Sequence, residues 1–463
     1  MTASMYRAII NLSLPIFVGQ IAVMANGVID TVMAGRVSAV DQAAVGIGMS
    51  VFFSVFVPLM GVLLAVPPII AQHYGARDDL AVGEDVRQGF WLTLILAPIV
   101  FLLLYFPDPF LYISQLKPEV EAKTLDYLRW TAWGSIAQFM FRLFYGFTTA
   151  ISQPRSVMLL SVFALALKVP LNFVFMYGYF GFTAMGGVGC AVATTVAVWI
   201  TVAIAAFIVW WNPNYQRFGI FNRWSWPIWQ HQWQLWKLGL PMGLTFLIDV
   251  TSVTFMALFV ARLGTTTAAA HGIATNLGAA AYMLPMSISV AVSVLIGQAI
   301  GAGDGRAARR VGLVGYRVAI ACGFAVAALI VLSSSAISRF YTNDVNVQTL
   351  ATQLLMLVAV YHVFDAVLAV GINGLRGYKN AVVPMIVCGV CLWGVGLGGG
   401  YVLGLQGGIG GNRPLGAPGF WYAAIVSYGL AGMILVAYFN YVSRAHLRKT
   451  AKTGSAIFAA QQP

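Results

Sequence analysis

Charged residues are scarce in this sequence. Asp, Glu, Lys and Arg together make up 9% of its 463 residues, whereas hydrophobic residues make up 60%. A soluble domain carries roughly 25% charged residues, so this chain has too few of them to cover a water-facing surface. In lipid, backbone polar groups must bond to one another, so long apolar segments have to form helices. The composition therefore excludes a soluble globular protein and indicates an all-α integral membrane protein.

Motifs for ATP use and for catalysis are absent. The sequence contains no G-x-x-x-x-G-K-[ST], H-E-x-x-H or G-x-S-x-G pattern. Cys388 and Cys391 have the spacing of a redox pair, but they lie in an apolar segment, so we expect them to pack helices together. An intramembrane enzyme would need a clustered nucleophile or metal site, and the sequence shows neither. We therefore expect no enzyme activity and no cofactor.

Long apolar runs are abundant, and about twelve of them can form transmembrane helices of roughly 20 residues or more. The expected spans are 8–34, 46–70, 89–112, 127–150, 156–178, 188–211, 237–261, 271–298, 312–337, 349–373, 382–404 and 420–442. Residues 1–10 lack the basic start and the cleavage site of a signal peptide, so we expect the first span to be retained.

The two halves of the chain repeat one another in one register. Leu14-Pro15 recurs as Leu240-Pro241, at an offset of 226 residues. At the same offset the second half also repeats Gln72, Gly75, Ala76 and Asp78, as Gln298, Gly301, Ala302 and Asp304. Six helices are an even number, so the halves run in the same direction through the membrane. Such parallel repeats are typical of secondary transporters, with the substrate between the halves, and they disfavour a passive channel.

These patterns predict four parts. Residues 1–211 are expected to form an N-terminal six-helix lobe and residues 237–442 a C-terminal six-helix lobe, with a cytoplasmic tail over 443–463. Residues 212–236 are rich in Trp and Arg and poor in carboxylates, which is typical of the cytoplasmic headgroup layer. We interpret them as an interfacial linker. A substrate-reading aromatic patch is the alternative.

The formal net charge of +12 has a topological origin. Most Lys and Arg residues outside the spans lie in the loops on the side of the two termini, and such an excess marks the cytoplasmic side. We therefore expect both termini to be cytoplasmic. The contacts of the protein would be with membrane lipid and small molecules, and not with nucleic acid.

Three carboxylates, Asp30, Asp249 and Asp365, lie within the hydrophobic spans. A carboxylate at the middle of a membrane helix costs about 2.5–3.5 kcal/mol, so each needs an offsetting interaction. One interpretation is structural, in which an acid pairs with Arg142 or Lys168 and holds helices together. The other is that the acids bind a cation.

The neighbours of the acids favour cation binding. Thr245 and Ser252 lie four residues before and three residues after Asp249, so they share a helical face with it. Tyr361 and His362 lie four and three residues before Asp365 and share a face with that acid. Oxygen atoms around two carboxylates suit Na⁺, or a proton bound to a carboxylate in an apolar environment. For Asp30 we expect Asn172 as the partner, whereas Lys168 lies near a helix end and is expected to extend to the membrane interface.

The sequence resembles the multidrug and toxic compound extrusion (MATE) family, in its NorM-type bacterial branch. The resemblance covers nearly the whole chain. It is carried by residues 30–35 (Asp-Thr-Val-Met-Ala-Gly), residues 72–78, Pro170-Leu171-Asn172 with residues 186–189, and Asp365 followed by residues 374–379.

The resemblance implies a transporter that exports cationic, often aromatic drugs and dyes in exchange for Na⁺ or H⁺. By the same resemblance, Asp365, Tyr361 and Asp249 form the cation site of the C-terminal lobe, while Asp30 and Asn172 form a polar cluster in the N-terminal lobe. Asp30, Asp249 and Asp365 would line the substrate cavity. Many NorM-type proteins have Glu where this chain has the shorter Asp249.

We therefore predict a multidrug efflux antiporter for lipophilic, mostly cationic compounds. The alternative is a flippase of the related superfamily that moves lipid-linked oligosaccharides; such a protein would line its cavity with Arg or Lys to bind pyrophosphate. For the coupling ion we favour Na⁺, which needs several oxygens at once. Protons acting at Asp30 are the alternative, or a second coupled ion.

Overall fold

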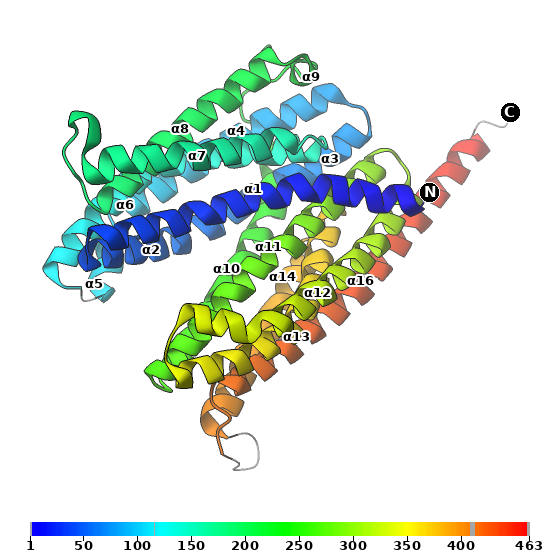
Figure 1. Ribbon diagram of the computed structural model, residues 1–463. Coiled ribbons are helices and arrows are strands. Elements are labelled where there is room, and N and C mark those ends of the chain that lie inside the picture. The colour runs from blue at the N-terminus through cyan, green and yellow to red at the C-terminus, as the bar shows by residue number, and fades with distance from the viewer. Residues whose placement is uncertain (1, 115, 408–412, 461–463) are drawn as a thin grey trace. The chain divides into compact units, whose positions relative to one another are not determined.

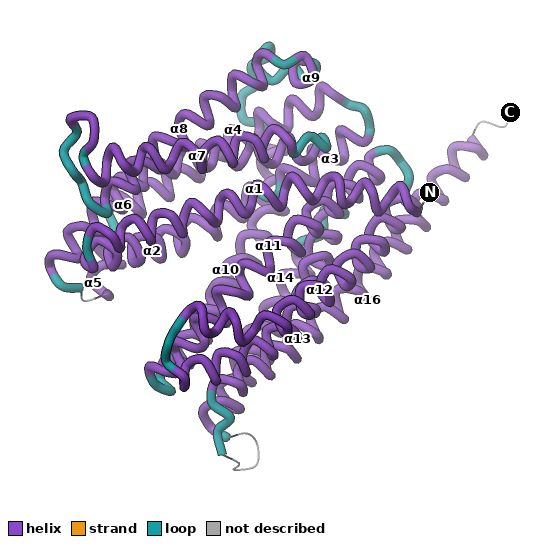
Figure 2. The backbone as a smooth tube through the Cα atoms, in the orientation of Figure 1, coloured by secondary structure: helices purple, strands orange, loops and turns teal. Residues whose placement is uncertain are grey.

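The computed structural model describes residues 2–114, 116–407 and 413–460, which are almost entirely helical (Figures 1 and 2). The first half contains α1 (Thr2–Val37), α2 (Ala39–Leu63), α3 (Val66–Gly75), α4 (Asp79–Tyr105), α5 (Asp108–Ser114), α6 (Pro118–Ala150), α7 (Arg155–Tyr177), α8 (Val188–Trp211) and α9 (Pro213–Gln216). The second half contains α10 (Trp229–Ala261), α11 (Thr265–Gly301), α12 (Gly305–Tyr341), α13 (Val345–Gly377), α14 (Val382–Cys388), α15 (Gly399–Tyr401) and α16 (Ala417–Ala460).

Within the described residues, eleven helical segments are long and apolar enough to cross a membrane. The expected span that is not among them, 127–150, lies in α6, a helix of 33 residues. This helix packs against α2, α4 and α8, and many of its side chains are buried. A helix shielded from lipid by its neighbours needs fewer apolar residues. The predicted all-helical membrane fold is thus confirmed, with eleven or twelve spans.

Two expected spans are not simple α-helices. The second consists of α2 and α3, which together form one membrane-length segment, Ala39–Gly75. The eleventh begins as α14 and continues through two π-helical stretches, Gly389–Gly398 and Val402–Gln406, on either side of α15. A π-helix is rare in proteins, and where it occurs it is frequently found at a functional site.

The chain divides into two compact units. One contains residues 14–243, and the other contains residues 1–13 together with 244–463. The division falls inside α1 and inside α10, close to the repeated prolines Pro15 and Pro241. The functional parts expected from the sequence, 1–211, 212–236, 237–442 and 443–463, remain a prediction. In the structure α16 continues as a helix well beyond residue 442.

The repeat is visible in the local geometry of each unit. Asp78 accepts a hydrogen bond from the Ala81 amide at 3.0 Å, and Asp304 accepts one from the Ala307 amide at 2.8 Å. Each Asp caps the start of the next long helix and stabilises it by about 1 kcal/mol. The residues before the two caps, Arg77 and Gly303, both have a left-handed backbone. Glycine adopts this conformation without strain, and it occupies the second of the two positions.

The segment between the halves is fixed to α4 within the unit that contains residues 14–243. The Gln88 side chain donates to the Trp226 carbonyl at 2.9 Å and accepts from the Ile228 amide at 3.0 Å. The Trp91 indole donates to the Ser225 carbonyl at 2.9 Å. Exposed tryptophans extend from this ordered segment, as expected of a membrane-interface position.

Candidate ion-binding and substrate-binding sites

The unit that contains residues 244–463 places Asp249 of α10 beside two tyrosines. The Tyr428 hydroxyl of α16 donates to Asp249 Oδ1 at 3.0 Å. A side-chain hydrogen bond links Tyr428 to Tyr361 of α13, and their ring centroids are 4.5 Å apart. Tyr428 has one hydroxyl proton, so while it donates to Asp249 it accepts from Tyr361. The three residues therefore form a hydrogen-bonded chain from Tyr361 to the carboxylate.

Asp365 of α13 lies in the same environment. Its side chain is buried, yet none of the described residues makes a hydrogen bond to its carboxylate. The nearest basic group is the imidazole of His362, whose Nδ1 is 4.0 Å from Asp365 Oδ2. The carboxylate is close enough to Asp249 for their charges to repel each other, and it also acts electrostatically on Tyr282 of α11. Two neighbouring acids without a Lys or Arg partner among the described residues, Asp365 buried and Asp249 partly exposed, favour the uptake of a cation.

One of the two hydroxyls that we expected to join this site from α10, that of Ser252, has a different partner. Ser252 donates to the Leu392 carbonyl at 3.5 Å, and Ser427 of α16 donates to the Cys391 carbonyl at 2.8 Å. Both acceptors lie in the first π-helical stretch. The π-helical segment is thus bonded to the two helices that carry Asp249 and Tyr428.

The other unit holds Asp30 of α1 in a buried ion pair. Lys168 Nζ of α7 is 2.6 Å from Asp30 Oδ2 and donates to Thr194 Oγ1 of α8 at 2.7 Å. Asn172 Nδ2 donates to Asp30 Oδ1 at 3.1 Å. The lysine side chain is 3% exposed, so the prediction that Lys168 extends to the membrane interface is wrong. The buried ammonium group is compensated by the Asp30 carboxylate, and hydrogen bonds from Lys168 to Thr194 and from Asn172 to Asp30 support the pair.

The structural alternative considered for the three acids therefore applies to one of them. Asp30 pairs with Lys168, whereas neither Asp249 nor Asp365 has a Lys or Arg partner among the described residues. Arg142 makes no ion pair with any described residue; its guanidinium instead lies 4.6 Å from the centroid of the Tyr145 ring.

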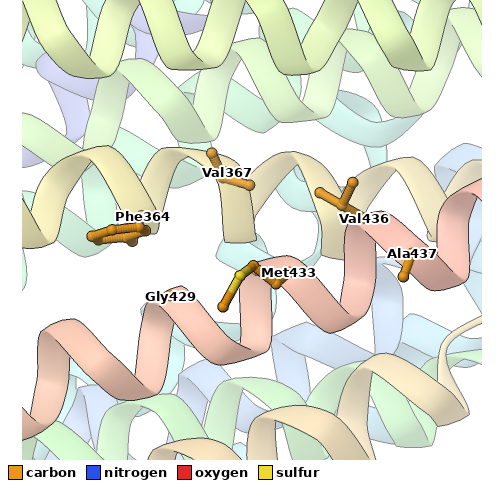
Figure 3. A pocket seen from close by; sticks show the side chains of 7 residues that line it. Phe364, Val367, Gly429, Met433, Val436 and Ala437 are labelled. Atoms are coloured by element: carbon orange, nitrogen blue, oxygen red, sulfur yellow. The ribbon is translucent and has the colours of Figure 1, made fainter.

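An apolar groove of about 340 Å³ runs between α13 and α16 (Figure 3). Its lining includes Phe364 and Gly429, which directly precede Asp365 and follow Tyr428 in the sequence. All of its lining side chains are apolar, so the groove offers no ligand to an ion. In the described residues, no cluster of three His, Cys, Asp or Glu side chains is arranged to hold a metal ion.

Comparison with known proteins identifies the family. The MatE family model matches the chain twice, over residues 15–174 and over residues 241–402. The two matches begin at Pro15 and Pro241, the prolines that the internal repeat makes equivalent. The chain belongs to the MATE family. Membership makes it a multi-pass membrane transporter rather than an enzyme.

The curated relatives belong to the NorM branch of the MATE family. The chain is 37% identical over 444 residues to "Probable multidrug resistance protein NorM" of Chromobacterium violaceum, covering 96% of this chain and 95% of that protein. It is 35% identical to "Multidrug resistance protein NorM" of Aliivibrio fischeri, covering 92% of each. The resemblance inferred from the sequence is therefore confirmed.

Solved structures of MATE transporters share the fold. An outward-facing multidrug resistance MATE family transporter superposes with a TM-score of 0.85 at 20% identity, covering 95% of this chain and 96% of that chain. A eukaryotic MATE transporter superposes with a TM-score of 0.86 at 16% identity, covering 97% and 99%. At these identities the likeness shows the MATE fold alone.

Sequence reasoning missed two residues of the Asp249 environment in this MATE chain. Tyr428 and Tyr282 are single tyrosines in apolar helices, with no neighbouring pattern to distinguish them from tyrosines that only pack. Their position beside the acids depends on the packing of α11 and α16 against α13. The distance in sequence between Asp249 and Tyr428 gives no indication of the contact.

Proposed function

We propose that this MATE protein exports lipophilic, mostly cationic drugs and dyes in exchange for a cation that enters the cell. The observation that carries the proposal is the pair of intramembrane acids, the partly exposed Asp249 and the buried Asp365, without a Lys or Arg partner among the described residues. Two uncompensated carboxylates in a membrane are costly, and binding a cation relieves that cost. The names of the NorM relatives support drug efflux as the use of this exchange.

We further propose Na⁺ as the coupling ion. Asp365, Asp249 and the Tyr361 hydroxyl supply oxygen ligands of the type that hard cations prefer. Protons are the alternative, either on the chain from Tyr361 to Asp249 or at Asp30, where proton uptake would break the ion pair with Lys168. A drug cation and the coupling ion would then compete for the same negative charge.

The flippase alternative is supported less well. Recognition of a pyrophosphate needs several unpaired basic groups, because each phosphate oxygen carries charge. In the unit with residues 14–243, Lys168 is neutralised by Asp30 and makes a poor phosphate ligand.

The proposed placement follows the charge pattern. Lys and Arg gather in loops on the side of the termini, which supports an inner-membrane protein with both termini cytoplasmic. We propose that the protein acts as a monomer in contact with membrane lipid.

The test is ethidium efflux from proteoliposomes under separately imposed Na⁺ and H⁺ gradients. We expect efflux that depends on one of the gradients and that is lost in Asp365→Asn. Asp344→Asn is the matched control, since Asp344 begins the same helix, is exposed, and caps it through a bond that Asn can also make. Efflux that continues after both gradients collapse would contradict the proposal.

A further inference from the structure

One exposed face of α12 is not used by the ion sites described above. Arg310, Arg317 and Phe324 follow one another along it at intervals of seven residues, which is about two helical turns, and all three are exposed. Ile320, three residues beyond Arg317, is exposed as well. The face is therefore basic near the start of the helix and apolar farther along it.

The arginines lie where α12 passes through the headgroup layer. The helix has 37 residues and is about 55 Å long, whereas the hydrocarbon core of a membrane is roughly 30 Å thick. Arg317 lies about 18 Å from the start of the helix, close to the level at which hydrocarbon begins, and an arginine there extends its charged end toward the lipid phosphates. No Asp or Glu occurs between Asp304 and Asp344, and Arg317 pairs with no carboxylate among the described residues.

The internal repeat relates α12 to α4 of the other unit. A Cβ atom at Gly89 would meet Val66, and one at Gly315 would meet Val292. Both residues of the second pair follow those of the first by 226 positions, so α12 packs within its own unit as α4 packs within the other. The faces of the two helices can therefore be compared residue by residue.

The same offset aligns Arg310 and Arg317 with Glu84 and Trp91 of α4. In α4 this face is covered by the connection between the halves, because Trp91 stacks on Trp226 with ring centroids 5.8 Å apart. In α12 the corresponding Arg317 is exposed among the described residues. The chain thus covers this face itself in one unit and leaves it open in the other.

The long helix α16 packs on a different side of α12 (Figure 1). A Cβ atom at Gly305 would meet His446, and one at Gly312 would meet Phe439. Successive residues of an α-helix are about 100° apart, so these two glycines lie roughly opposite Arg310. The contact with α16 therefore leaves the face with the arginines accessible to a partner outside the chain.

We propose that Arg310 and Arg317 bind the phosphate of an anionic phospholipid whose acyl chain lies against Ile320 and Phe324. Such a lipid carries charge at one end and hydrocarbon at the other, in the order in which this face changes from basic to apolar. A guanidinium binds a phosphate through two parallel hydrogen bonds. A soluble phosphate would need no apolar surface below the arginines, so the face fits a lipid. The site goes beyond the proposed ion exchange and does not depend on it.

The test compares two lipids that share their acyl chains, dioleoyl phosphatidylglycerol, which is anionic, and dioleoyl phosphatidylcholine, which is zwitterionic. Each is titrated into the full-length protein in detergent micelles, and bound lipid is counted by native mass spectrometry. We expect the wild type to prefer the anionic lipid. One basic side chain near a membrane surface contributes about fivefold to the affinity for anionic lipid, so Arg317→Gln should weaken phosphatidylglycerol binding by about that factor. Phosphatidylcholine binding should change little.

Phe324→Ala tests the apolar part of the face. It should weaken the binding of both lipids by a similar factor, because their acyl chains are the same, and so leave the preference between them intact. An excess of inorganic phosphate should displace neither lipid. Displacement of phosphatidylglycerol by phosphate, with no effect of Phe324→Ala, would show a site for soluble anions and overturn the lipid assignment.

Arg444→Gln is the matched control. Arg444 is an exposed arginine near the same end of the unit, but it lies on α16 and not on this face of α12. It should leave the preference for phosphatidylglycerol unchanged. Equal weakening in Arg444→Gln and Arg317→Gln would show that the arginines attract anionic lipid only through their general charge. That result, or an unchanged preference in Arg317→Gln, would overturn the site.

Discussion

Lys168 and Asp30 show how a membrane protein can carry charge at low cost. The pair is buried, 2.6 Å apart, and further hydrogen-bonded by Thr194 and Asn172. Breaking such a pair leaves one uncompensated charge, whereas removing both charges often has little effect on stability. The pair therefore matters for stability mainly because neither charge can be removed without leaving the other one buried and unpaired.

We predict that Lys168→Met lowers the stability of the protein by roughly 3–5 kcal/mol, because it leaves Asp30 buried and unpaired. The double variant Asp30→Leu with Lys168→Met should recover most of that loss. Thermal unfolding of the detergent-solubilised variants measures the loss of stability in the single variant and its recovery in the double variant. If the single and the double variant unfold at the same temperature, the pair does not have the energetic role assigned to it.

Asp365 should behave in the opposite way. None of the described residues bonds to its carboxylate, so Asp365→Asn removes a charge without leaving an unpaired partner. We predict that Na⁺ raises the unfolding temperature of the wild type, because a ligand that binds only the folded state stabilises it. In Asp365→Asn this Na⁺-dependent rise should disappear while the protein remains at least as stable without Na⁺. A rise of the same size in the variant would exclude Asp365 as an ion ligand.

At the scale of secondary structure, the connection between the halves is an ordered element. Gln88 of α4 bonds to Trp226 and Ile228 of this connection and to Gln232 at the start of α10. One buried side chain thus satisfies several groups of a segment that would otherwise expose its backbone. The Trp-rich sequence suggested an interfacial linker, which remains a prediction, and it gave no sign that α4 holds the segment.

We predict that Gln88→Leu releases the connection, because it leaves the Trp226 carbonyl and the Ile228 amide without their partner. Hydrogen exchange of residues 225–232 should become markedly faster, consistent with a loss of about 1–3 kcal/mol for unpaired buried groups. Gln230→Leu, an exposed position on α10, serves as the control and should leave exchange unchanged. Unchanged protection in Gln88→Leu would show that the tryptophan contacts alone fix the segment.

For the whole molecule, the proposed exchange requires that a bound ion in one unit alter drug binding. Which of the intramembrane acids bind the coupling ion depends on whether that ion is Na⁺ or a proton. Na⁺ would use the oxygens around Asp249 and Asp365, while a proton would need one carboxylate only.

We predict that drug efflux at fixed pH rises and saturates as the external Na⁺ concentration is increased, and that Asp365→Asn flattens this curve. Asp30→Asn tests the proton alternative in the same assay. Should Na⁺ leave wild-type efflux unchanged while a pH step drives it, and should Asp30→Asn abolish that response, protons acting at Asp30 would replace Na⁺ as the coupling ion.

The membrane fold, the repeat and the three intramembrane acids can all be inferred from the amino-acid sequence. These follow from local facts: apolar runs of membrane length, a fixed offset between matching residues, and charges placed where lipid makes them costly. The family resemblance rested on the same short segments, and the comparisons confirmed it.

Only the tertiary structure decided which partner each acid has. Lys168 lies within a helix whose end is close to the interface, and the sequence cannot distinguish a side chain that extends to lipid headgroups from one that turns inward to Asp30. Tyr428 and Asp249 are far apart in sequence, and their hydrogen bond exists only because α16 meets α10 in the folded chain. Arg142 likewise appeared as a possible partner for the acids, but among the described residues it pairs with no acid and lies over the Tyr145 ring. Pairing depends on which helix faces meet, and that is a property of packing between distant segments rather than of any one of them.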